Sequence, residues 1–226
     1  MTKEELYNLL DEMSLPDTIV SKLYAPQWHF WKKETHIKGN EVFPLLREFI
    51  ELRAEKSDTE IRENAYSVLA KLLLDNIQIE YCQFLIDRLA VETNKHVLHT
   101  MLNDIRRLQL PEEINISPVI ACSKSEQWLV RHNAIMALGI SNTTESREAV
   151  RYWVRQTDHK KYRFELFYAN SVLGNIGEPN DIALLEQHIH SRIKDVRGTA
   201  VYAIENIKKR FGMAEIEAGE RSSPLL

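Results

Sequence analysis

The sequence predicts an all-α protein, a right-handed α-solenoid of about five stacked helix pairs with an N-terminal helical cap. Glycine and proline number only seven each in 226 residues, fewer than the many tight turns of a β-sandwich or β-barrel usually need. A short motif recurs along the chain at nearly constant spacing, and an amphipathic segment precedes each copy. Stacked helical repeats have this periodicity, because one helix pair cannot bury its apolar face alone.

Three stretches carry the recurring motif most clearly. In each, an apolar residue precedes an arginine and an alanine follows three positions after it: EIRENAYSVLA (60–70), LVRHNAIMALG (129–139) and DVRGTAVYAIE (195–205). Two weaker copies, HVLHTMLNDI (96–105) and FELFYANSVLG (164–174), have Leu98 and Leu166 at the arginine position. The marker positions 62, 98, 131, 166 and 197 are then separated by 31 to 36 residues. We therefore expect five units of two helices each.

The first helix of each unit is predicted from the segment before each copy. In each of these segments, apolar residues recur three and four positions apart, which is the pattern of a helix with one face packed on a core. The segments are VFPLLREFIELRA (42–54), IEYCQFLIDRLAVE (79–92), ISPVIACS (116–123), SREAVRYWVRQT (146–157) and DIALLEQHIHS (181–191). Capping boxes, which satisfy free backbone N–H groups at helix starts, are expected at Thr2, Ser57 and Ser123. Gly139 and Gly177 are expected to end helices.

The repeated pattern [DE]-[VI]-R-x-x-A-x-x-A-[LI] resembles the HEAT repeat, and is most similar to the short subtype of phycobilisome-lyase-like proteins. The resemblance covers roughly residues 41–212 and implies a solenoid of HEAT-like repeats there. Residues 1–40 are then expected to form the N-terminal helical cap, and the polar segment 213–226 a flexible tail.

The resemblance also implies that the marker arginines Arg62, Arg131 and Arg197 form a ladder of ion pairs with acids of neighbouring units. The acids nearby in sequence are Asp58, Glu60, Glu126 and Asp195. Alternatively, these arginines could form a stripe that binds phosphates. The ladder is favoured, because the family pattern contains this arginine in proteins that bind no anionic ligand.

Composition narrows the classes of function. A net charge of −4 argues against non-specific binding to nucleic acid, which needs a basic surface. Cys82 and Cys122 lie among apolar residues and are expected to be free thiols in a reducing compartment. The acidic, amphipathic start MTKEELYNLLDEM does not resemble a signal peptide, and no apolar run approaches the roughly 18 residues of a membrane span. We expect a cytoplasmic protein that does not bind a membrane.

No motif in the sequence predicts catalysis, a metal site or a cofactor. The nucleophile and nucleotide motifs G-x-S-x-G, Walker A and G-x-G-x-x-G are absent from the sequence. His96 and His99 could share a helix face, and His188 and His190 could not, but no further ligand pattern accompanies either pair. We therefore predict no catalytic residues, no metal and no cofactor.

Candidate partner-binding residues follow from the helix period. If the residues one before and three, six and seven after each marker are buried, the positions one, two and five after it face away, toward the concave side. These positions predict a binding surface that includes Glu63, His99, His132, Asn133, Met136, Phe167, Tyr168 and Tyr202. An error of one position in this phase would instead place them in the core. Trp128, Tyr152 and Trp153 are expected to pack between repeats, and PQWHFWKK (26–33) to cover the end of the first repeat or to line the binding groove.

The leading hypothesis is a non-catalytic protein-binding module or adaptor, for example an inhibitor or immunity protein, that holds another protein on its concave surface. Aromatic residues on an exposed face favour such an interface. The alternative is a DNA-binding protein similar to HEAT-like alkylpurine DNA glycosylases, with Lys160, Lys161 and Arg163 as contacts. The third is a lyase or accessory factor for a cofactor-bearing protein, suggested by the repeat subtype alone.

Overall fold

The described part of the protein is entirely helical. The computed structural model describes residues 2–13, 39–53 and 59–213, and no strand occurs among them. The chain divides into two compact units, residues 1–118 and 119–226. The prediction of an all-α repeat fold is therefore confirmed, whereas its right-handed sense and the boundaries of cap, solenoid and tail stay predictions. The predicted capping box at Ser57, the segment 26–33 and the tail beyond residue 213 lie outside the described residues.

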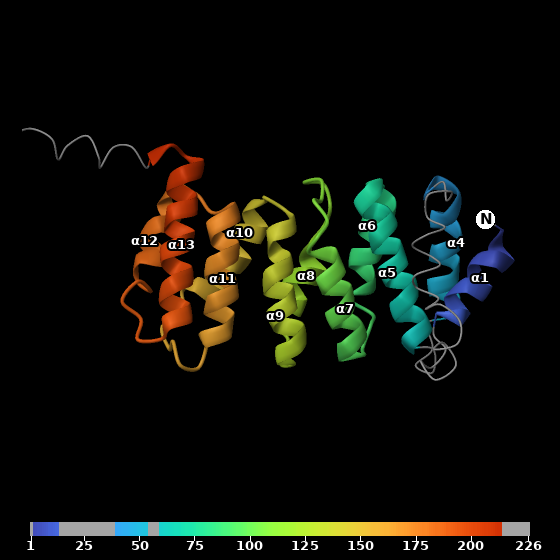
Figure 1. Ribbon diagram of the computed structural model, residues 1–226, viewed down its shortest axis with the longest axis horizontal. Coiled ribbons are helices and arrows are strands. Elements are labelled where there is room, and N and C mark those ends of the chain that lie inside the picture. Colours follow the sequence, from blue (N-terminus) through green and yellow to red (C-terminus); the bar gives the residue numbers. More distant parts are fainter. Residues whose placement is uncertain (1, 14–38, 54–58, 214–226) are drawn as a thin grey trace, which may run out of the picture. The chain divides into compact units, whose positions relative to one another are not determined.

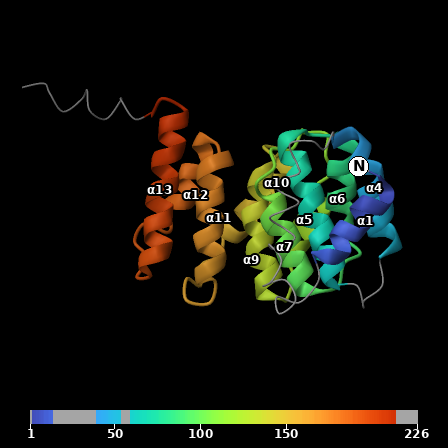
Figure 2. The same ribbon diagram turned by 45° about the vertical axis from the view of Figure 1, so that its right-hand side comes forward.

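The first unit is built around one long helix (Figure 1). Its helices are α1 (Lys3–Glu12), α4 (Gly39–Leu52), α5 (Thr59–Asp75), α6 (Ile79–Arg88) and α7 (Lys95–Ile105), and the short α8 (Ser117–Cys122) begins at its end. Helix α5 contacts α1, α4, α6 and α7, and α1 also lies against α4 (Figure 2). The capping box predicted at Thr2 is present at the start of α1. The core of this unit includes the fully buried Phe43, Phe49, Leu69 and Leu85.

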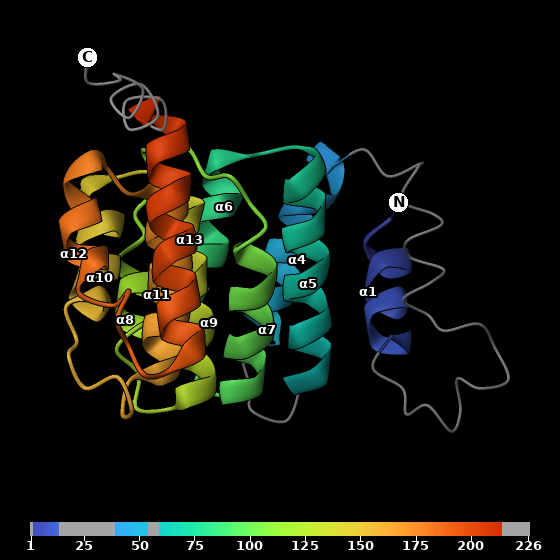
Figure 3. The ribbon, with the colours of Figure 1, turned by 60° about the vertical axis from the view of Figure 1, so that its left-hand side comes forward.

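The second unit stacks its second helices side by side. It contains α9 (Trp128–Ala137), which continues as the 3-10 helix η3 (Leu138–Ile140), then α10 (Thr144–Val154), α11 (Arg163–Ile176), η4 (Pro179–Asp181), α12 (Ile182–Glu186) and α13 (Lys194–Arg210). Helix α11 contacts both α9 and α13, while α10 packs on α11 and α12 on α13. Figure 3 shows α10 and α12 together on one side of α11 and α13. The ten predicted helices, two for each of five pairs, are thus all present, with shifted ends.

Two small residues allow the closest of these helix contacts. A Cβ atom added to Gly174 in α11 would lie 2.8 Å from the Cα atom of Ala203 in α13. Such a separation is about 1 Å shorter than the optimum between carbon atoms, so no side chain fits at position 174. The small residues of the motif therefore bring together the second helices of neighbouring pairs, and not only the two helices of one pair.

The arginine ladder is confirmed at two of its three positions, but with other acids than predicted. Arg62 pairs with Glu92 (Nε to Oε2, 3.2 Å), and Arg131 pairs with Glu165 (Nη2 to Oε1, 2.7 Å). Each partner lies in the next helix pair, 30 and 34 residues further along the chain. The predicted acids near the markers lie in the arginine's own helix pair, and Asp195 bonds Arg163 of the preceding pair and no marker arginine.

The marker arginines also close the turn that precedes their own helix. Arg131 and Arg197 each donate from Nη1 to the backbone carbonyl six residues earlier, at Ser125 (2.8 Å) and Ser191 (2.6 Å). Arg62 donates from Nη1 to the carbonyl of Arg53, nine residues earlier (3.3 Å). A role in holding this turn explains why the motif keeps an arginine in all three copies.

The capping box predicted at Ser123 is wrong. Its hydroxyl donates to the carbonyl of Ile120 in the last turn of α8, at 2.7 Å. Helix α9 begins only at Trp128, after Gln127, whose side chain makes no capping hydrogen bond. Ser123 therefore ends one helix and does not begin the next.

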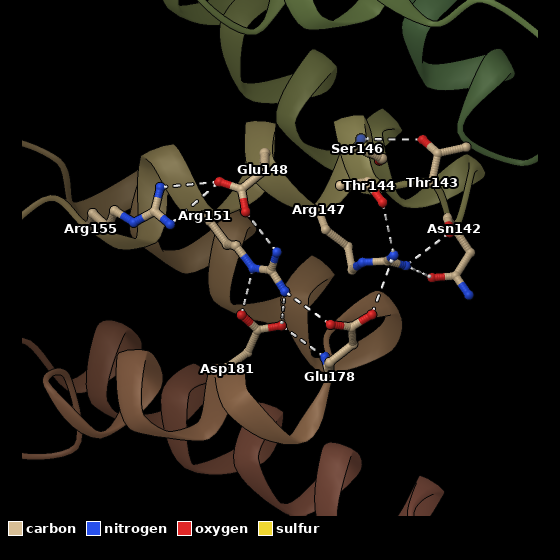
Figure 4. Close-up of polar contacts among 10 residues, drawn as sticks. All are labelled: Asn142, Thr143, Thr144, Ser146, Arg147, Glu148, Arg151, Arg155, Glu178 and Asp181. Atoms are coloured by element: carbon tan, nitrogen blue, oxygen red, sulfur yellow. Dashed lines mark hydrogen bonds and ion pairs between the residues drawn. The ribbon is translucent and has the colours of Figure 1, made fainter.

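Charged side chains join the first helices of the second unit (Figure 4). Arg151 of α10 donates to both carboxylate oxygens of Asp181 (2.6 and 2.9 Å), at the start of α12, and also to Glu148 (2.7 Å). Arg147 pairs with Glu178 at 3.3 Å. Arg155 also pairs with Glu148, at 3.4 Å. Three arginines and three carboxylates therefore share this cluster, whose charges balance, and it links α10 to the start of α12.

Candidate functional site

A mostly apolar pocket of about 430 Å³ lies on the second helices of the second unit. It is formed by α9, by α11 and by the turn before α11, and its walls are Trp128, Arg131, His132, Lys161, Phe164, Glu165 and Tyr168. A pocket of this volume is within the range that binds small molecules or single side chains.

Three aromatic rings surround His132 in this pocket. The ring centroids of Trp128 and Phe164 lie 5.7 Å from that of His132, and the Tyr168 centroid lies 5.5 Å from it. Trp128 is 62% exposed and Phe164 is 53% exposed, whereas His132 is buried. Exposure of two large rings next to each other is unusual, because most large aromatic side chains bury their area in the core.

A buried carboxylate forms the base of the pocket. Oε1 of Glu165 accepts from Nε of Arg131 (2.8 Å) and lies 3.1 Å from Nε2 of His132. Nη2 of Arg131 also approaches this same oxygen, at 2.7 Å, so all three contacts converge on Oε1 and none involves Oε2. Burial alone would raise the pKa of Glu165, but its own backbone N–H, Arg131 and His132 together lower it. The carboxylate is therefore charged at neutral pH.

His132 is neutral at the same pH. Burial lowers its pKa below the ordinary value of 6.5, and this effect outweighs the hydrogen bond with Glu165, which favours the charged ring. A carboxylate can only accept, so the neutral ring has its proton on Nε2 and donates it to Glu165. Arg131 is thus the one full positive charge at the base.

The repeat itself places these side chains together. Helix α9 begins at Trp128 and α11 begins at Arg163, so Trp128 and Phe164 both lie in the first turn of a second helix. A residue in the first turn has no preceding turn of its own helix to cover it. Because α11 packs against α9, Glu165 reaches Arg131 of the preceding pair and the two first turns share one pocket.

The predicted exposure is wrong for two of the eight candidate residues. His132 and Asn133 are buried, at 8% and 6% exposure, because α11 packs on the side of α9 that was expected to be open. The amide of Asn133 donates to the carbonyl of Leu129 within α9, at 2.8 Å. The alternative of a core position is therefore correct for both residues.

The other candidates have partly or fully accessible side chains. Tyr202 of α13 is 57% exposed, and the remaining five are half-buried: Glu63, His99, Met136, Phe167 and Tyr168. Of the eight, only His132 and Tyr168 line the pocket, and Phe167 stacks edge-on against Tyr168. A role of these residues in binding a partner stays a prediction.

Glu63 and His99 belong to the first unit and have a setting of their own. Glu63 accepts from the hydroxyl of Thr100 at 2.7 Å and lines a more polar pocket of about 440 Å³ with Ser67 and Asp104. Met13 is also part of its wall, and residues 14–38, which follow it directly, are outside the described part.

Sequence reasoning did not select Trp128, Phe164 or Glu165 as binding residues; it predicted Arg131 as a ladder residue and named Lys161 only as a contact in the DNA-binding alternative. Trp128 was expected to pack between repeats and is instead the most exposed tryptophan among the described residues. One signal could have found the site. Two successive second helices both have an aromatic residue two or three positions before the marker, Trp128 before Arg131 and Phe164 before Leu166.

Other reactive groups do not form a second site of this kind. Both cysteines are free, and burial raises the pKa of Cys122 to about 11. Within residues 2–13, 39–53 and 59–213, no three His, Cys, Asp or Glu side chains gather as a metal site would require. No helix in the same ranges is long and apolar enough to cross a membrane.

Comparison with known proteins finds a family match over part of the chain. Residues 116–205 match the HEAT-repeat family. Among solved structures, an engineered protein from a structural genomics consortium is 17% identical, with 92% of this chain and 90% of that chain covered and a TM-score of 0.46. A designed armadillo repeat protein is 14% identical, with 91% and 92% covered and a TM-score of 0.47. No curated protein matches the sequence.

Proposed function

We propose that the protein is a non-catalytic binding module that holds another protein on the second helices of its second unit, in the segment 116–205 that matches the HEAT-repeat family. The observation that carries this proposal is that two exposed aromatic rings, Trp128 and Phe164, line a pocket whose base is the hydrogen-bonded group of Arg131, His132 and Glu165. Tryptophan is among the residues that contribute most to binding energy at protein interfaces, and it does so near pockets from which water is excluded.

Hydrogen bonds link the two helices at the base of the pocket. Arg131 of α9 donates to Glu165 of α11 and to the carbonyls of Ser125 and Glu126. Groups that are already held in place lose less conformational freedom on binding, which favours this base as part of a docking surface.

The chemistry of the wall residues supports binding over catalysis. They include no serine, threonine or cysteine that could act as a nucleophile. Oε1 of Glu165 accepts from both Arg131 and His132, so the acid serves to link α9 and α11. A net charge of −4 for the whole chain would favour a partner with a basic surface around the pocket contact.

The test is capture of partners from an extract of the source cells by the tagged full-length chain. The wild type is compared with the Trp128→Ala and Phe164→Ala variants, which remove exposed rings and should leave the fold intact. Tyr152→Ala is the matched control, because Tyr152 is a 47% exposed aromatic residue on the first helix α10. We expect a protein retained by the wild type and the control but lost by both pocket variants. Equal retention by all four chains would remove the proposal.

A DNA-binding enzyme is the second candidate, and one observation favours it. Glu165 supplies a carboxylate among aromatic rings, with Lys161 beside it. Against this, Glu165 is bonded to Arg131 and His132, and the chain has a net negative charge. Phosphate contacts dominate DNA affinity at low salt, so a duplex-binding assay at about 50 mM salt decides. Tight binding there that weakens steeply with added salt would favour the enzyme over the protein-binding module.

A further inference from the structure

We propose that the pocket on α9 and α11 takes one tryptophan or tyrosine side chain of the partner, whose ring N–H or hydroxyl donates to Glu165. This inference rests on the proposed protein-binding function and names the chemical group that is recognised. It follows from three properties of the pocket: its aromatic wall, the carboxylate oxygen Oε2 of Glu165 that accepts from neither Arg131 nor His132, and the positive charges beside it.

The wall suits a flat ring. Trp128, Phe164 and Tyr168 are all within 5.5 to 5.7 Å of the His132 ring and tilted by 43° to 55° to it. Aromatic rings prefer offset or edge-to-face neighbours with centroids about 4.5 to 7 Å apart, and tilted rings around one point offer such positions to an additional ring. An aromatic guest would therefore cover the exposed parts of Trp128 and Phe164.

The base selects a guest with a donor at its edge. Arg131 and His132 both bond Oε1 of Glu165, which leaves Oε2 without any of these contacts. The Glu165 side chain is only 5% exposed, and a guest that covered the pocket without donating would remove the water access that this carboxylate still has. The free-energy cost of leaving an ionised acceptor without a hydrogen-bond donor exceeds the net gain from an ordinary hydrogen bond. Phenylalanine and aliphatic side chains, which have no donor, are therefore disfavoured.

The charges at the wall exclude a basic guest. The negative charge of Glu165 is already compensated by Arg131 at 2.7 Å, and Lys161 lines the same pocket. A lysine or arginine of the partner would meet two like charges and one neutralised acid. The same two cations are attracted to the electron-rich face of an aromatic guest, which favours tryptophan and tyrosine further.

The test uses N-acetyl amino acid amides as probes of a single side chain, titrated at millimolar concentration into the ¹⁵N-labelled full-length chain. The indole N–H signal of Trp128 reports on the pocket, and Trp128→Phe assigns it. We expect saturable shifts with the tryptophan and tyrosine amides. The phenylalanine amide and the 1-methyltryptophan amide, which lack the donor, should bind about tenfold more weakly, as expected for loss of one hydrogen bond to a charged group.

Two variants control the titration. Trp128→Ala should abolish the shifts of α9 and α11 backbone signals, and Tyr152→Ala should leave the affinities unchanged. Equal affinity for tryptophan and 1-methyltryptophan amides would overturn the proposal, as would preference for the arginine amide or an absence of saturable binding by any probe.

The proposed function and this inference can fail separately. If no amide binds but Trp128→Ala still loses the captured partner, the protein-binding function stands and the aromatic anchor is wrong. If the tryptophan amide binds as expected but partner capture does not depend on Trp128, the pocket recognises an aromatic ligand and the protein-binding function is wrong.

Discussion

Replacing two glycines by alanine should change stability in opposite directions. Gly174 in α11 faces α13, where an added Cβ would lie 2.8 Å from Cα and 3.0 Å from Cβ of Ala203. Gly198, within α13 itself, has no atom within 4 Å of an added Cβ. The same chemical change is therefore made once against a packed backbone and once into open space.

The magnitudes follow from two effects. Alanine is favoured over glycine inside a helix by about 1 kcal/mol, and both variants gain this amount. Overpacking costs about 1 to 3 kcal/mol, and the upper end applies at Gly174 because the backbone of Ala203 must move. We expect Gly174→Ala to be about 2 kcal/mol less stable than the wild type and Gly198→Ala to be about 1 kcal/mol more stable.

Thermal unfolding followed by circular dichroism at 222 nm measures both effects. For a chain of this size 1 kcal/mol shifts the midpoint by about 2 to 4 °C, so the two variants should differ by roughly 6 to 12 °C. Hydrogen exchange in α11 and α13 shows whether the change arises in the second unit. If both variants raise the midpoint equally, α11 and α13 do not pack as closely as described, and the account of the small residues is wrong.

Two further predictions concern the charges and histidines of the second unit. Asp181→Ala removes both oxygens that bind Arg151, and we expect it to cost about 3 kcal/mol because Asp181 is buried, whereas Asp195→Ala, whose partner Arg163 is exposed, should cost less than about 1 kcal/mol in urea unfolding. Burial lowers the pKa of His188, whose Nε2 donates to the carbonyl of Val154 at 2.6 Å. The folded state therefore binds fewer protons, and stability should fall as the pH drops below about 6.5. His188→Gln should flatten this loss between pH 7.5 and pH 5.5, and an unchanged slope would contradict it.

The helix pairs were predictable because the repeated motif consists of residues that are close together in the sequence. Marker positions with a stripe of apolar residues recur every 31 to 36 residues, an arginine occupies three of the five, and each copy lies in a second helix. Helix ends were less predictable. The Ser123 capping box failed because the serine hydroxyl found a nearer acceptor in the helix that it ends.

The candidate site was predictable only in part, because burial depends on neighbouring helices. The helix period predicts which residues share a face, but it does not predict which face of α9 is covered by α11. His132 was predicted to be exposed on a second helix; it lies on that helix but is buried, with the rings of Trp128 and Phe164 next to it. Glu165 was missed as the partner of Arg131, because an ion pair across 34 residues leaves no local signal.

The affinity of the captured partner for the Trp128→Ala variant tests the central claim most directly. An exposed ring that anchors an interface contributes about 2 kcal/mol or more, so the dissociation constant should rise at least about thirtyfold relative to the wild type. The Tyr152→Ala control should bind as the wild type does. A dissociation constant for Trp128→Ala equal to that of the wild type would show that the pocket on α9 and α11 is not the docking surface.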